Sequence, residues 1–209
     1  MPTPVHLRAD TLAMRYGRRV LFRGLSFEAR GGDTLAITGT NGSGKSTLLR
    51  LLVGVATPVR GTITLSVDGV ETPAAQRPRV VGLAGPYLGL YDGFSAHETL
   101  AFIAQARGLS MNGIAPLLDR VGLGDRAKDR VGTFSSGMQQ RLRLATALLA
   151  TPPVLLLDEP GATLDAAGRA LVRDLITEQQ AAGTLVVVAT NDPAEAALCE
   201  RTLAIGDFV

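Results

Sequence analysis

The residues Gly39-Thr40-Asn41-Gly42-Ser43-Gly44-Lys45-Ser46-Thr47 follow the pattern G-x-x-x-x-G-K-[ST], which is typical of a phosphate-binding loop. The apolar run Thr34–Thr38 ahead of them predicts a buried strand, and the spacing of residues 46–52 behind them predicts a helix. Strand, glycine loop and helix is the order that such a loop requires. The alternative is an ordinary glycine-rich turn before a helix, which three glycines, a lysine and two hydroxyls in register disfavour.

The residue types of this loop suit a nucleotide that carries phosphates. Glycines at positions 39, 42 and 44 permit backbone angles that turn successive N–H groups toward phosphate oxygens at the positive end of a helix. Lys45 would reach the β- and γ-phosphates, and the Ser46 hydroxyl would hold Mg²⁺. The chain has 21 basic residues and only two are lysines, Lys45 and Lys128, so one of them stands where this chemistry requires it. The remaining residues of the predicted binding loop are Thr40, Asn41, Ser43 and Thr47.

The composition indicates one α/β domain. A chain of 209 residues with 46% hydrophobic and 4% aromatic residues predicts a core of Leu, Val, Ala and Ile. The longest uncharged run, residues 144–157, is too short for a membrane span and contains Pro152-Pro153, and the amino terminus shows no signal peptide. We therefore expect a cytoplasmic protein. The net charge of +2 is too weak to indicate nucleic acid, which we do not expect as a partner, and the single Cys199 excludes an internal disulfide.

The hydrophobic pattern predicts strands that alternate with helices through most of the chain. The expected strands cover residues 5–14, 25–29, 34–38, 62–67, 80–84, 154–157, 184–189 and 202–205. The expected helices cover residues 46–54, 95–107, 110–120, 137–149, 166–181 and 194–199, with Ser95 and Ser110 as amino-terminal caps. Tyr16-Gly17-Arg18-Arg19 predicts a turn, and Asp68-Gly69 predicts a tight hairpin.

This order of elements predicts an α/β fold with a mostly parallel core sheet that binds its ligand at the carboxyl ends of the strands. The early strands indicate a small antiparallel β subdomain beside the nucleotide site. We expect residues 86–150 to form an inserted helical subdomain, and residues 1–85 and 151–209 to form the core with the antiparallel part. Together, residues 1–209 are expected to be a single domain.

A second candidate site follows the buried strand at residues 154–157, where Asp158-Glu159-Pro160 places two carboxylates at the strand end. Asp158 can bind Mg²⁺, directly or through water, and Glu159 can polarise an attacking water. The alternative is an acidic turn before a proline. A phosphate-binding loop in the same chain makes that the weaker interpretation.

A third candidate site, Phe134-Ser135-Ser136-Gly137-Met138-Gln139-Gln140-Arg141, stands at the start of a predicted helix. A serine and glycine loop in this place offers a hydroxyl, N–H groups and the positive end of the helix dipole, which together make a second phosphate site. Taken alone, the segment could equally just cap the helix. Its position between the two other motifs resembles the ATP-binding cassette (ABC) ATPases.

The resemblance covers essentially the whole chain and implies a RecA-like P-loop NTPase fold that binds ATP and Mg²⁺. Tyr16 matches the aromatic residue that stacks on adenine, although it could equally be a surface tyrosine. The other matches are Gly39 to Ser46 with the Walker A loop, Ser135 and Gly137 with the signature motif, Asp158 and Glu159 with the Walker B end, and Asp165 with the D-loop. The chain looks most like the ATPase of the haem exporter used in cytochrome c maturation.

Three positions depart from the family's pattern. Ser136 stands where the first glycine of the signature is usual, which is a mild change. Pro86 stands where a glutamine normally contacts Mg²⁺ and the attacking water, and proline carries no such group. Asn191 stands where a switch histidine normally contacts the γ-phosphate, and we assign it to catalysis with Glu159 and Lys45. These losses imply near-normal ATP binding with slow intrinsic hydrolysis.

The resemblance implies the ATPase subunit of a transporter, peripheral on the inner face of the cell membrane. Its expected partners are a transmembrane permease subunit and a second ATP-binding subunit, most simply another copy of the chain in a homodimer. A soluble ABC ATPase acting on ribosomes or DNA is the main alternative, although such relatives carry paired cassettes or long coiled coils. A third hypothesis is a GTPase or small kinase. Asp119-Arg120-Val121-Gly122 does match the pattern D-x-x-G, but the chain contains no Asn-Lys-x-Asp.

Overall fold

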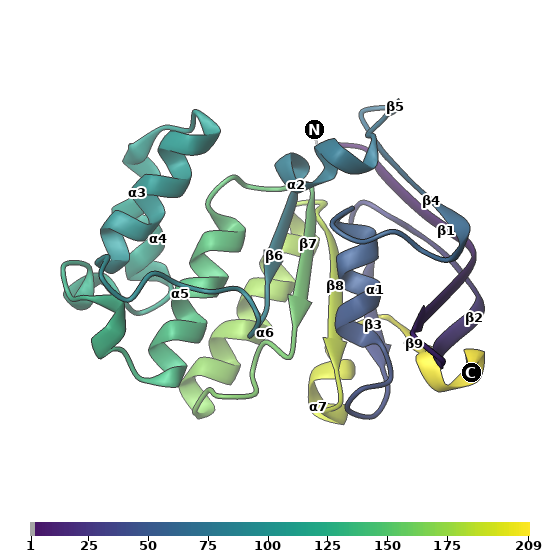
Figure 1. The fold of residues 1–209 in the computed structure, drawn as a ribbon. Helices are drawn as coiled ribbons and strands as arrows, with labels where there is room; N and C mark the ends of the chain where they lie inside the picture. The colour runs from purple at the N-terminus through teal and green to yellow at the C-terminus, as the bar shows by residue number, and fades with distance from the viewer. Residues whose placement is uncertain (1–2) are drawn as a thin grey trace.

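Two β-sheets enclose one helix, and further helices cover the outer face of one sheet (Figure 1). The computed structural model describes residues 3–209. Met1 and Pro2, which belong to the segment where we expected no signal peptide, lie outside the described residues, and that expectation stays a prediction. The expected α/β class, with one parallel and one antiparallel sheet, is confirmed.

The parallel sheet has the strand order β6-β7-β8-β3-β9. Every residue of β7 and β8 is buried, as expected for parallel strands that are covered on both faces. Their side chains alternate, so that Leu155 and Val186 belong to one hydrophobic cluster and Leu156 and Val187 to another. In chain order the strands are β3 (Thr34–Thr38), β6 (Val81–Ala84), β7 (Val154–Asp158), β8 (Leu185–Thr190) and β9 (Arg201–Ala204).

The antiparallel sheet has the strand order β2-β1-β4-β5. The predicted hairpin at Asp68-Gly69 joins the last two strands, and both turn residues have positive φ, 53° and 76°. Two positive φ values are what the tightest hairpin turns require. The strands are β1 (Val5–Tyr16), β2 (Arg19–Arg30), β4 (Arg60–Val67) and β5 (Val70–Glu71).

Strand β2 begins earlier than the sequence pattern predicted. It starts at Arg19 rather than Leu25, because β1 and β2 form one long hairpin whose pairing continues until Tyr16 lies opposite Arg19. The turn is therefore Gly17-Arg18 alone, with a φ of 57° at Gly17. Register shifts along this hairpin interrupt the alternation of apolar and polar residues. The period-two pattern consequently misses the first part of β2.

Helix α1 (Lys45–Leu52) starts where the glycine loop ends and lies between the two sheets (Figure 1). Its buried residues Leu48 and Leu52 share a hydrophobic cluster with Phe22 of β2 and with Ile37 of β3. Burial of each leucine contributes about 2 kcal/mol of transfer free energy. The helix is therefore held from both sides, and this fixes the position of Lys45 in its first turn.

Helices α5 (Ser136–Leu148) and α6 (Ala166–Ala181) cover the opposite face of the parallel sheet (Figure 1). Leu144 of α5 and Val172 of α6 pack there with the side chains of β7 and β8. The last helix, α7 (Pro193–Ala196), is shorter than the expected 194–199, because the residues after it turn the chain into β9.

A second group of helices lies beyond α5, at the edge of the molecule farthest from the antiparallel sheet (Figure 1). Leu100 of α3 (Ala96–Arg107) and Leu118 of α4 (Ile114–Arg120) form a cluster with Leu142 of α5. Because α5 also contributes Leu144 to the core cluster, it belongs to both parts. Helix α5 thus joins the helical group to the core.

Serine caps set the starts of these helices. Ser95 makes a full capping box at α3: its hydroxyl accepts from the Glu98 N–H at 3.1 Å, and the Glu98 carboxylate accepts from the Ser95 N–H at 2.8 Å. Ser110 instead caps the short 3₁₀ turn Met111–Gly113. The expected helix from residue 110 therefore starts later, at Ile114.

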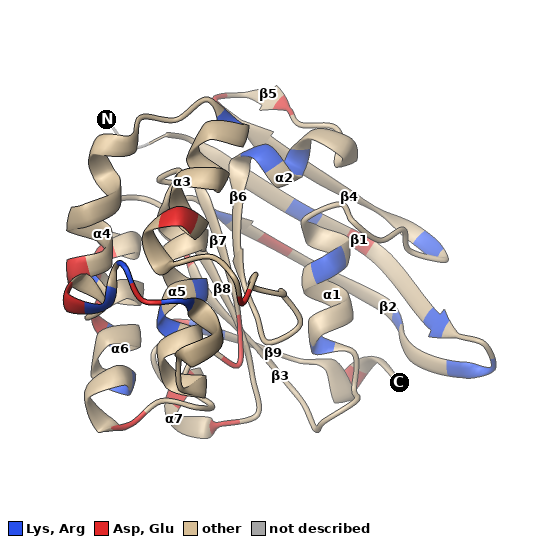
Figure 2. Ribbon diagram, turned by 60° about the vertical axis from the view of Figure 1, so that its left-hand side comes forward, with Lys and Arg blue, Asp and Glu red and all other residues tan. Residues whose placement is uncertain are grey.

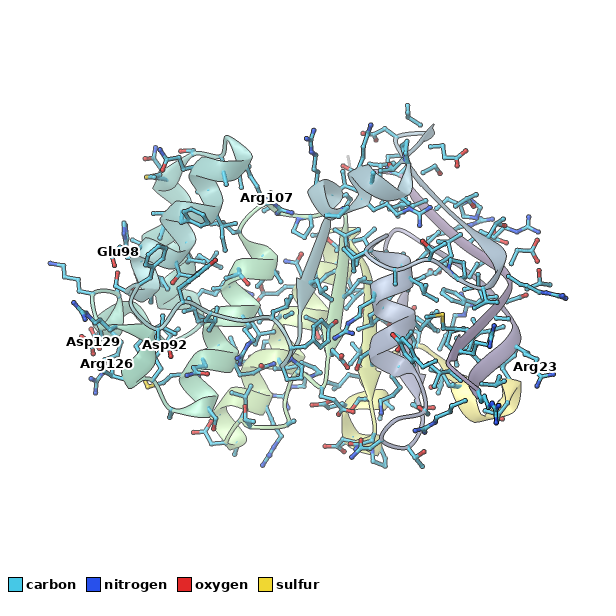
Figure 3. All side chains as sticks on the ribbon, in the orientation of Figure 1. Arg23, Asp92, Glu98, Arg107, Arg126 and Asp129 are labelled. Atoms are coloured by element: carbon cyan, nitrogen blue, oxygen red, sulfur yellow. The ribbon has the colours of Figure 1, made fainter. Side chains whose placement is uncertain are left out.

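The carboxyl end of α3 is tied to the core. Arg107, labelled in Figure 3, donates a hydrogen bond to the Pro78 carbonyl in α2 (Arg77–Val80). The link joins the helical group to the segment just ahead of β6. Across residues 3–209, no helix is both long enough and apolar enough to cross a membrane.

Candidate nucleotide-binding site

Three segments that are distant in sequence meet at the carboxyl ends of the parallel strands (Figure 1). Thr38, the last residue of β3, pairs with Thr190 of β8, and Asp158, the last residue of β7, pairs with Ala189. Parallel strands that pair in register end at the same edge of a sheet. The glycine loop, the pair Asp158 and Glu159, and the residues after Thr190 are therefore neighbours.

The glycine loop is packed closely against the start of β2. Gly44 is the residue before α1 and has a φ of 112°, which L side chains rarely adopt. A Cβ atom on Gly44 would also lie 3.2 Å from Leu21 and 3.3 Å from Phe22. Next to it, the Ser43 hydroxyl oxygen is buried and makes no hydrogen bond with any described residue. An unpaired polar group at a helix start suits a ligand oxygen.

Lys45 is the buried cation of this site. Its side chain is 6% exposed, and its Nζ donates to the Gly39 carbonyl at 2.9 Å and lies 3.2 Å from Glu159 Oε1. The ammonium group therefore bridges the glycine loop and the end of β7. A phosphate is an equally suitable anionic partner, because charge-assisted hydrogen bonds of this kind are the strong ones.

Asp158 carries an unsatisfied buried carboxylate. The residue is 1% exposed, and neither carboxylate oxygen has a hydrogen-bond partner among the described residues. Burial raises the pKa of Asp158, the Ser46 hydroxyl opposes that change, and the neighbouring Glu159 adds to it. A hydroxyl beside two free carboxylate oxygens is an oxygen donor set that fits a hard divalent cation. Such a cation would favour the charged carboxylate.

Glu159 has a backbone conformation that is rare for its residue type. Its φ is 47°, and the left-handed region costs a non-glycine residue about 1–2 kcal/mol. The Glu159 N–H donates to the Ala189 carbonyl at 2.8 Å, which holds this conformation. The carboxylate then accepts from the Thr190 hydroxyl at 3.3 Å and from the Asn191 N–H at 3.4 Å. Retained strain of this kind is concentrated at functional sites.

Asn191 reaches the glycine loop from the end of β8. Its Nδ2 donates to Asn41 Oδ1 at 3.0 Å, while its backbone N–H faces Glu159. The structure thus brings together Lys45, Glu159 and Asn191, which the sequence assigned to catalysis.

A cleft of about 410 Å³ opens beside these residues. Tyr16, Ser46, Pro86 and Asp158 are part of its lining. The lining also includes Arg19, which sequence reasoning had placed in a turn without a role. Its Nη2 donates to the Gly42 carbonyl at 2.9 Å, and no local pattern in the sequence marks Arg19 for this contact. Figure 2 shows that basic residues are frequent on the antiparallel sheet and α1, which flank the glycine loop.

A known family matches the part of the chain that contains the glycine loop and the pair Asp158 and Glu159. The family described as ABC transporter matches residues 22–162, which are more than half of the chain. The chain belongs to the ABC transporter family. The family expected from the three sequence motifs is therefore confirmed.

Two curated ABC relatives illustrate the similarity. The Nod factor export ATP-binding protein I of Burkholderia orbicola (strain AU 1054) is 36% identical over 196 residues, which are 91% of this chain and 64% of that protein. The cytochrome c biogenesis ATP-binding export protein CcmA of Rhodopseudomonas palustris (strain BisB5) is 36% identical over 177 residues, which are 85% of this chain and 87% of that protein. The chain thus spans less than two thirds of the first relative and most of the second. The expected likeness to the cytochrome c maturation ATPase is confirmed.

A solved structure described as the ATP binding subunit of an ABC transporter has the same architecture. It superposes with a TM-score of 0.83 at 28% identity, over 95% of this chain and 85% of that chain. The arrangement of parallel core, antiparallel sheet and helical group is therefore that of ABC ATP-binding subunits, as the sequence predicted.

The segment that matches the ABC signature lies outside the cleft. The Ser135 hydroxyl accepts from the Met138 N–H at 3.3 Å and caps α5. Gly137 lies against the loop after β7, where a Cβ atom would come within 3.2 Å of the Thr163 carbonyl oxygen. Neither Ser135 nor Gly137 is part of the described lining of the cleft. The two phosphate sites that the sequence predicted are thus separate within one chain.

The segment 160–165, which contains the residue that matches the ABC D-loop, connects the signature helix to Glu159. The buried Gln140 Nε2 of α5 donates to the Pro160 carbonyl at 3.1 Å. At the other end of the segment, Asp165 caps α6 by accepting from the Gly168 N–H at 2.8 Å, and it lies 3.5 Å from Arg141 of α5. Helix α5 therefore holds both ends of this segment.

Proposed function

We propose that this chain binds and hydrolyses ATP as the ATPase subunit of an ABC transporter, and that closure of a pair of such subunits powers a separate membrane permease. The observation that carries the proposal is the 3.2 Å approach of Lys45 Nζ to Glu159 Oε1 in one cleft. A cation for the phosphates and a carboxylate for the attacking water are thereby within reach of the same phosphoryl group.

ATP binding is assigned to the loop 39–47 and Tyr16. Lys45 would exchange its contact with Glu159 for the β- and γ-phosphates, because three phosphate oxygens offer a stronger anionic partner. The loop N–H groups and the positive end of α1 would receive the remaining phosphate charge. The exposed ring of Tyr16 in the lining of the cleft supports its role as the platform for adenine.

Mg²⁺ is assigned to Ser46 and Asp158. The unpaired, buried oxygens of Asp158 support this, because buried polar atoms without a partner are rare unless a ligand or water completes them. A bound Mg²⁺ would neutralise charge that develops on the β- and γ-phosphates. The fold would hold the Ser46 hydroxyl and the Asp158 carboxylate together beside the glycine loop.

Activation of water is assigned to Glu159. Once Lys45 turns to the phosphates, the Thr190 hydroxyl and the Asn191 N–H still hold the carboxylate at the end of β7. Glu159 can then accept the proton of an attacking water as general base. Asn191 would add a neutral amide donor near the γ-phosphate, because its side chain already contacts the glycine loop through Asn41.

The proposed partner in ATP binding is a second copy of the chain. The signature residues Ser135 and Gly137 lie outside the described lining of the cleft, so one chain alone presents two incomplete halves of a phosphate site. Two copies related by a two-fold axis would each cap the cleft of the other. The exposed Asp165 at the start of α6 stands in the segment that such a contact would reach.

The other proposed partner is a transmembrane permease, which would hold this chain at the inner face of the cell membrane. Both relatives described above are named as ATP-binding export proteins, one for Nod factor export and the other for cytochrome c biogenesis. This supports a transporter ATPase over a soluble ABC ATPase of ribosomes or DNA. Cargo selection is assigned to the permease, because what these relatives share with the chain is the ATP-binding role.

The experiment that tests this function uses Glu159→Gln. The amide keeps the size and the hydrogen-bond acceptor of the side chain but cannot take the proton of water. We expect ATP with Mg²⁺ to convert this variant into a long-lived dimer in gel filtration, while the wild type returns to the monomer as it hydrolyses ATP.

Lys45→Ala is the control for this experiment. The substitution removes the cation for the β- and γ-phosphates, so the variant should lose most ATP affinity and stay monomeric. A Glu159→Gln protein that remains monomeric at high protein and ATP concentrations would contradict the proposed pair of identical subunits. Unchanged ATP affinity in Lys45→Ala would contradict the proposed binding loop.

A further inference from the structure

The turn that follows β6 carries a half-buried tyrosine next to Pro86. The Leu88 N–H donates to the Gly85 carbonyl at 3.1 Å, which closes a turn with Pro86 and Tyr87 at its centre. Arg143 of α5 holds this turn from outside, because its Nε donates to the Leu88 carbonyl at 3.0 Å. The proline ring fixes the backbone φ at position 86. The turn therefore presents Tyr87 in a defined direction.

The Tyr87 ring packs beside the Asp158 side chain. A Cβ atom on Gly85 would lie 3.0 Å from Tyr87 Cε1 and 3.1 Å from Asp158 Cβ, so the Tyr87 ring and the base of the Asp158 side chain flank the same glycine. The missing side chain at Gly85 is what lets both groups come close to its backbone. Arg50 of α1 stacks on the ring with its Cζ 4.2 Å from the ring centroid, which adds a cation–π contact that holds the ring.

Three buried polar atoms are left without hydrogen bonds at this place. Among the described residues, neither the Tyr87 hydroxyl nor either carboxylate oxygen of Asp158 has a partner. An unsatisfied buried polar group costs about 1–3 kcal/mol, so a group of them indicates a network that a ligand completes. A tyrosine hydroxyl carries its proton near neutral pH, so it is available as a hydrogen-bond donor.

We propose that Tyr87 is a positioning residue for the divalent cation of this site: its hydroxyl, which makes no hydrogen bond with the described residues, turns to donate to the Asp158 carboxylate when that carboxylate holds the cation, and so orients it as a ligand. The inference rests on the proposed function and extends it. Carboxylates that bind metals are commonly held by a hydrogen bond of their own, and loss of such a partner costs about 10–100-fold in metal affinity. The Pro86 side chain carries no hydrogen-bond donor, whereas the next residue, Tyr87, carries a hydroxyl.

The test uses Tyr87→Phe, which removes only the hydroxyl and keeps the ring that stacks with Arg50. A fluorescent ATP analogue is titrated into the wild type and the variant, first in EDTA and then at increasing Mg²⁺. We expect the same affinity for the analogue in EDTA. The Mg²⁺ concentration that gives half of the Mg²⁺-dependent increase in binding should rise about tenfold or more in the variant.

Tyr91→Phe is the matched control, because Tyr91 lies in the same loop but is 67% exposed, and its ring packs on Phe94 with ring centroids 5.4 Å apart. It should leave the Mg²⁺ requirement unchanged. A Tyr87→Phe protein with the Mg²⁺ requirement of the wild type would overturn the proposal, as would an equal loss of binding in EDTA, which marks a structural role. A wild type that does not bind the analogue at all would instead contradict the proposed function.

Discussion

Asn191, at the position that the sequence matches to the switch histidine of ABC ATPases, still forms hydrogen bonds at this site. Its amide donates to Asn41 at 3.0 Å, and its N–H contacts Glu159. An amide can donate to a phosphate, but it cannot become a cation, so it stabilises a developing negative charge less than a protonated histidine does. The backbone contact to Glu159 does not depend on the side chain and would survive a replacement.

Asn191→His should therefore raise the rate of a single turnover of ATP by about tenfold or more, since one preorganised contact is commonly worth about 10²–10³ in rate. ATP affinity should change little. Single-turnover hydrolysis measures this, with Asn112→His on the exposed surface as the control. A wild type that already hydrolyses ATP at about 1 s⁻¹ or faster, with no gain from the histidine, would show that this position is unimportant.

Glu195 is a second buried carboxylate, and it lies near Glu159. Its Oε1 accepts from the Gly161 N–H at 2.7 Å, whereas its Oε2 has no partner among the described residues. Burial raises the pKa of Glu195, and Glu159 and Asp192 add to this while Thr190 and the Gly161 N–H oppose it. The native state therefore holds this proton to a higher pH than the unfolded chain does, so stability falls as the pH rises through that interval.

Glu195→Gln should remove this dependence, because the amide oxygen can still accept from Gly161 and nothing ionises. At about pH 8 we expect a midpoint of thermal unfolding about 2 °C or more above that of the wild type, since each kcal/mol shifts the midpoint of a chain of this size by about 2–4 °C. The difference should shrink toward about pH 4.5. Glu200→Gln, at an exposed position, is the control and should show no such trend.

At the scale of single elements, capping distinguishes α3 from the turn that precedes α4. Ser95 satisfies N–H groups at the start of a twelve-residue helix through a reciprocal capping box. Ser110 makes one bond of 3.3 Å to a three-residue 3₁₀ turn. The same residue type therefore stabilises these two elements by different amounts.

Ser95→Ala should lower stability by about 1 kcal/mol, as the loss of a good amino-terminal cap usually does. The midpoint of thermal unfolding should fall by about 2–4 °C. Ser110→Ala is the matched comparison and should lower it by less than half as much. Equal losses in the two variants would mean that the cap of α3 is not what holds the helical group in place.

At the scale of the whole molecule, the separation of Lys45 from Ser135 makes the proposed dimer testable by mixing. Each site of a two-fold dimer would take Lys45 from one copy and Ser135 from the other. Ser135→Asp should disable a site by repelling phosphate, yet it should still cap α5, because aspartate is a good amino-terminal cap.

Lys45→Ala and Ser135→Asp should each be inactive alone, and an equal mixture should recover about a quarter of the wild-type ATPase rate. Half of the randomly formed dimers combine the two variants, and one of the two sites in each is then intact. Steady-state ATP hydrolysis at a fixed total protein concentration measures this. If the mixture stays inactive although the two variants combine in one ATP-dependent dimer, the signature residues do not act across the dimer.

The sequence by itself determined the fold class and the residues at the centre of the site. The loop 39–47, the strand that ends in Asp158 and the helix behind Ser135 each depend on short-range patterns: residues that permit particular backbone angles, and apolar residues repeated at the period of a helix or a strand. Such patterns act within one segment, so they can be recognised without knowledge of the other segments. The hairpin at Asp68-Gly69 was recognised in the same way.

Only the tertiary structure decided which of these segments touch. The approach of Arg19 to Gly42, of Tyr87 to Asp158 and of Glu195 to Gly161 depends on strand register and on packing between segments that are far apart in the chain. Their residue types are ordinary in their own segments, so no local pattern marks them. The position of Ser135 outside the cleft was likewise set by α5, which packs on both the core and the helical group. Contacts of this kind follow from how the hydrophobic clusters are shared among elements, which is a property of the assembled chain.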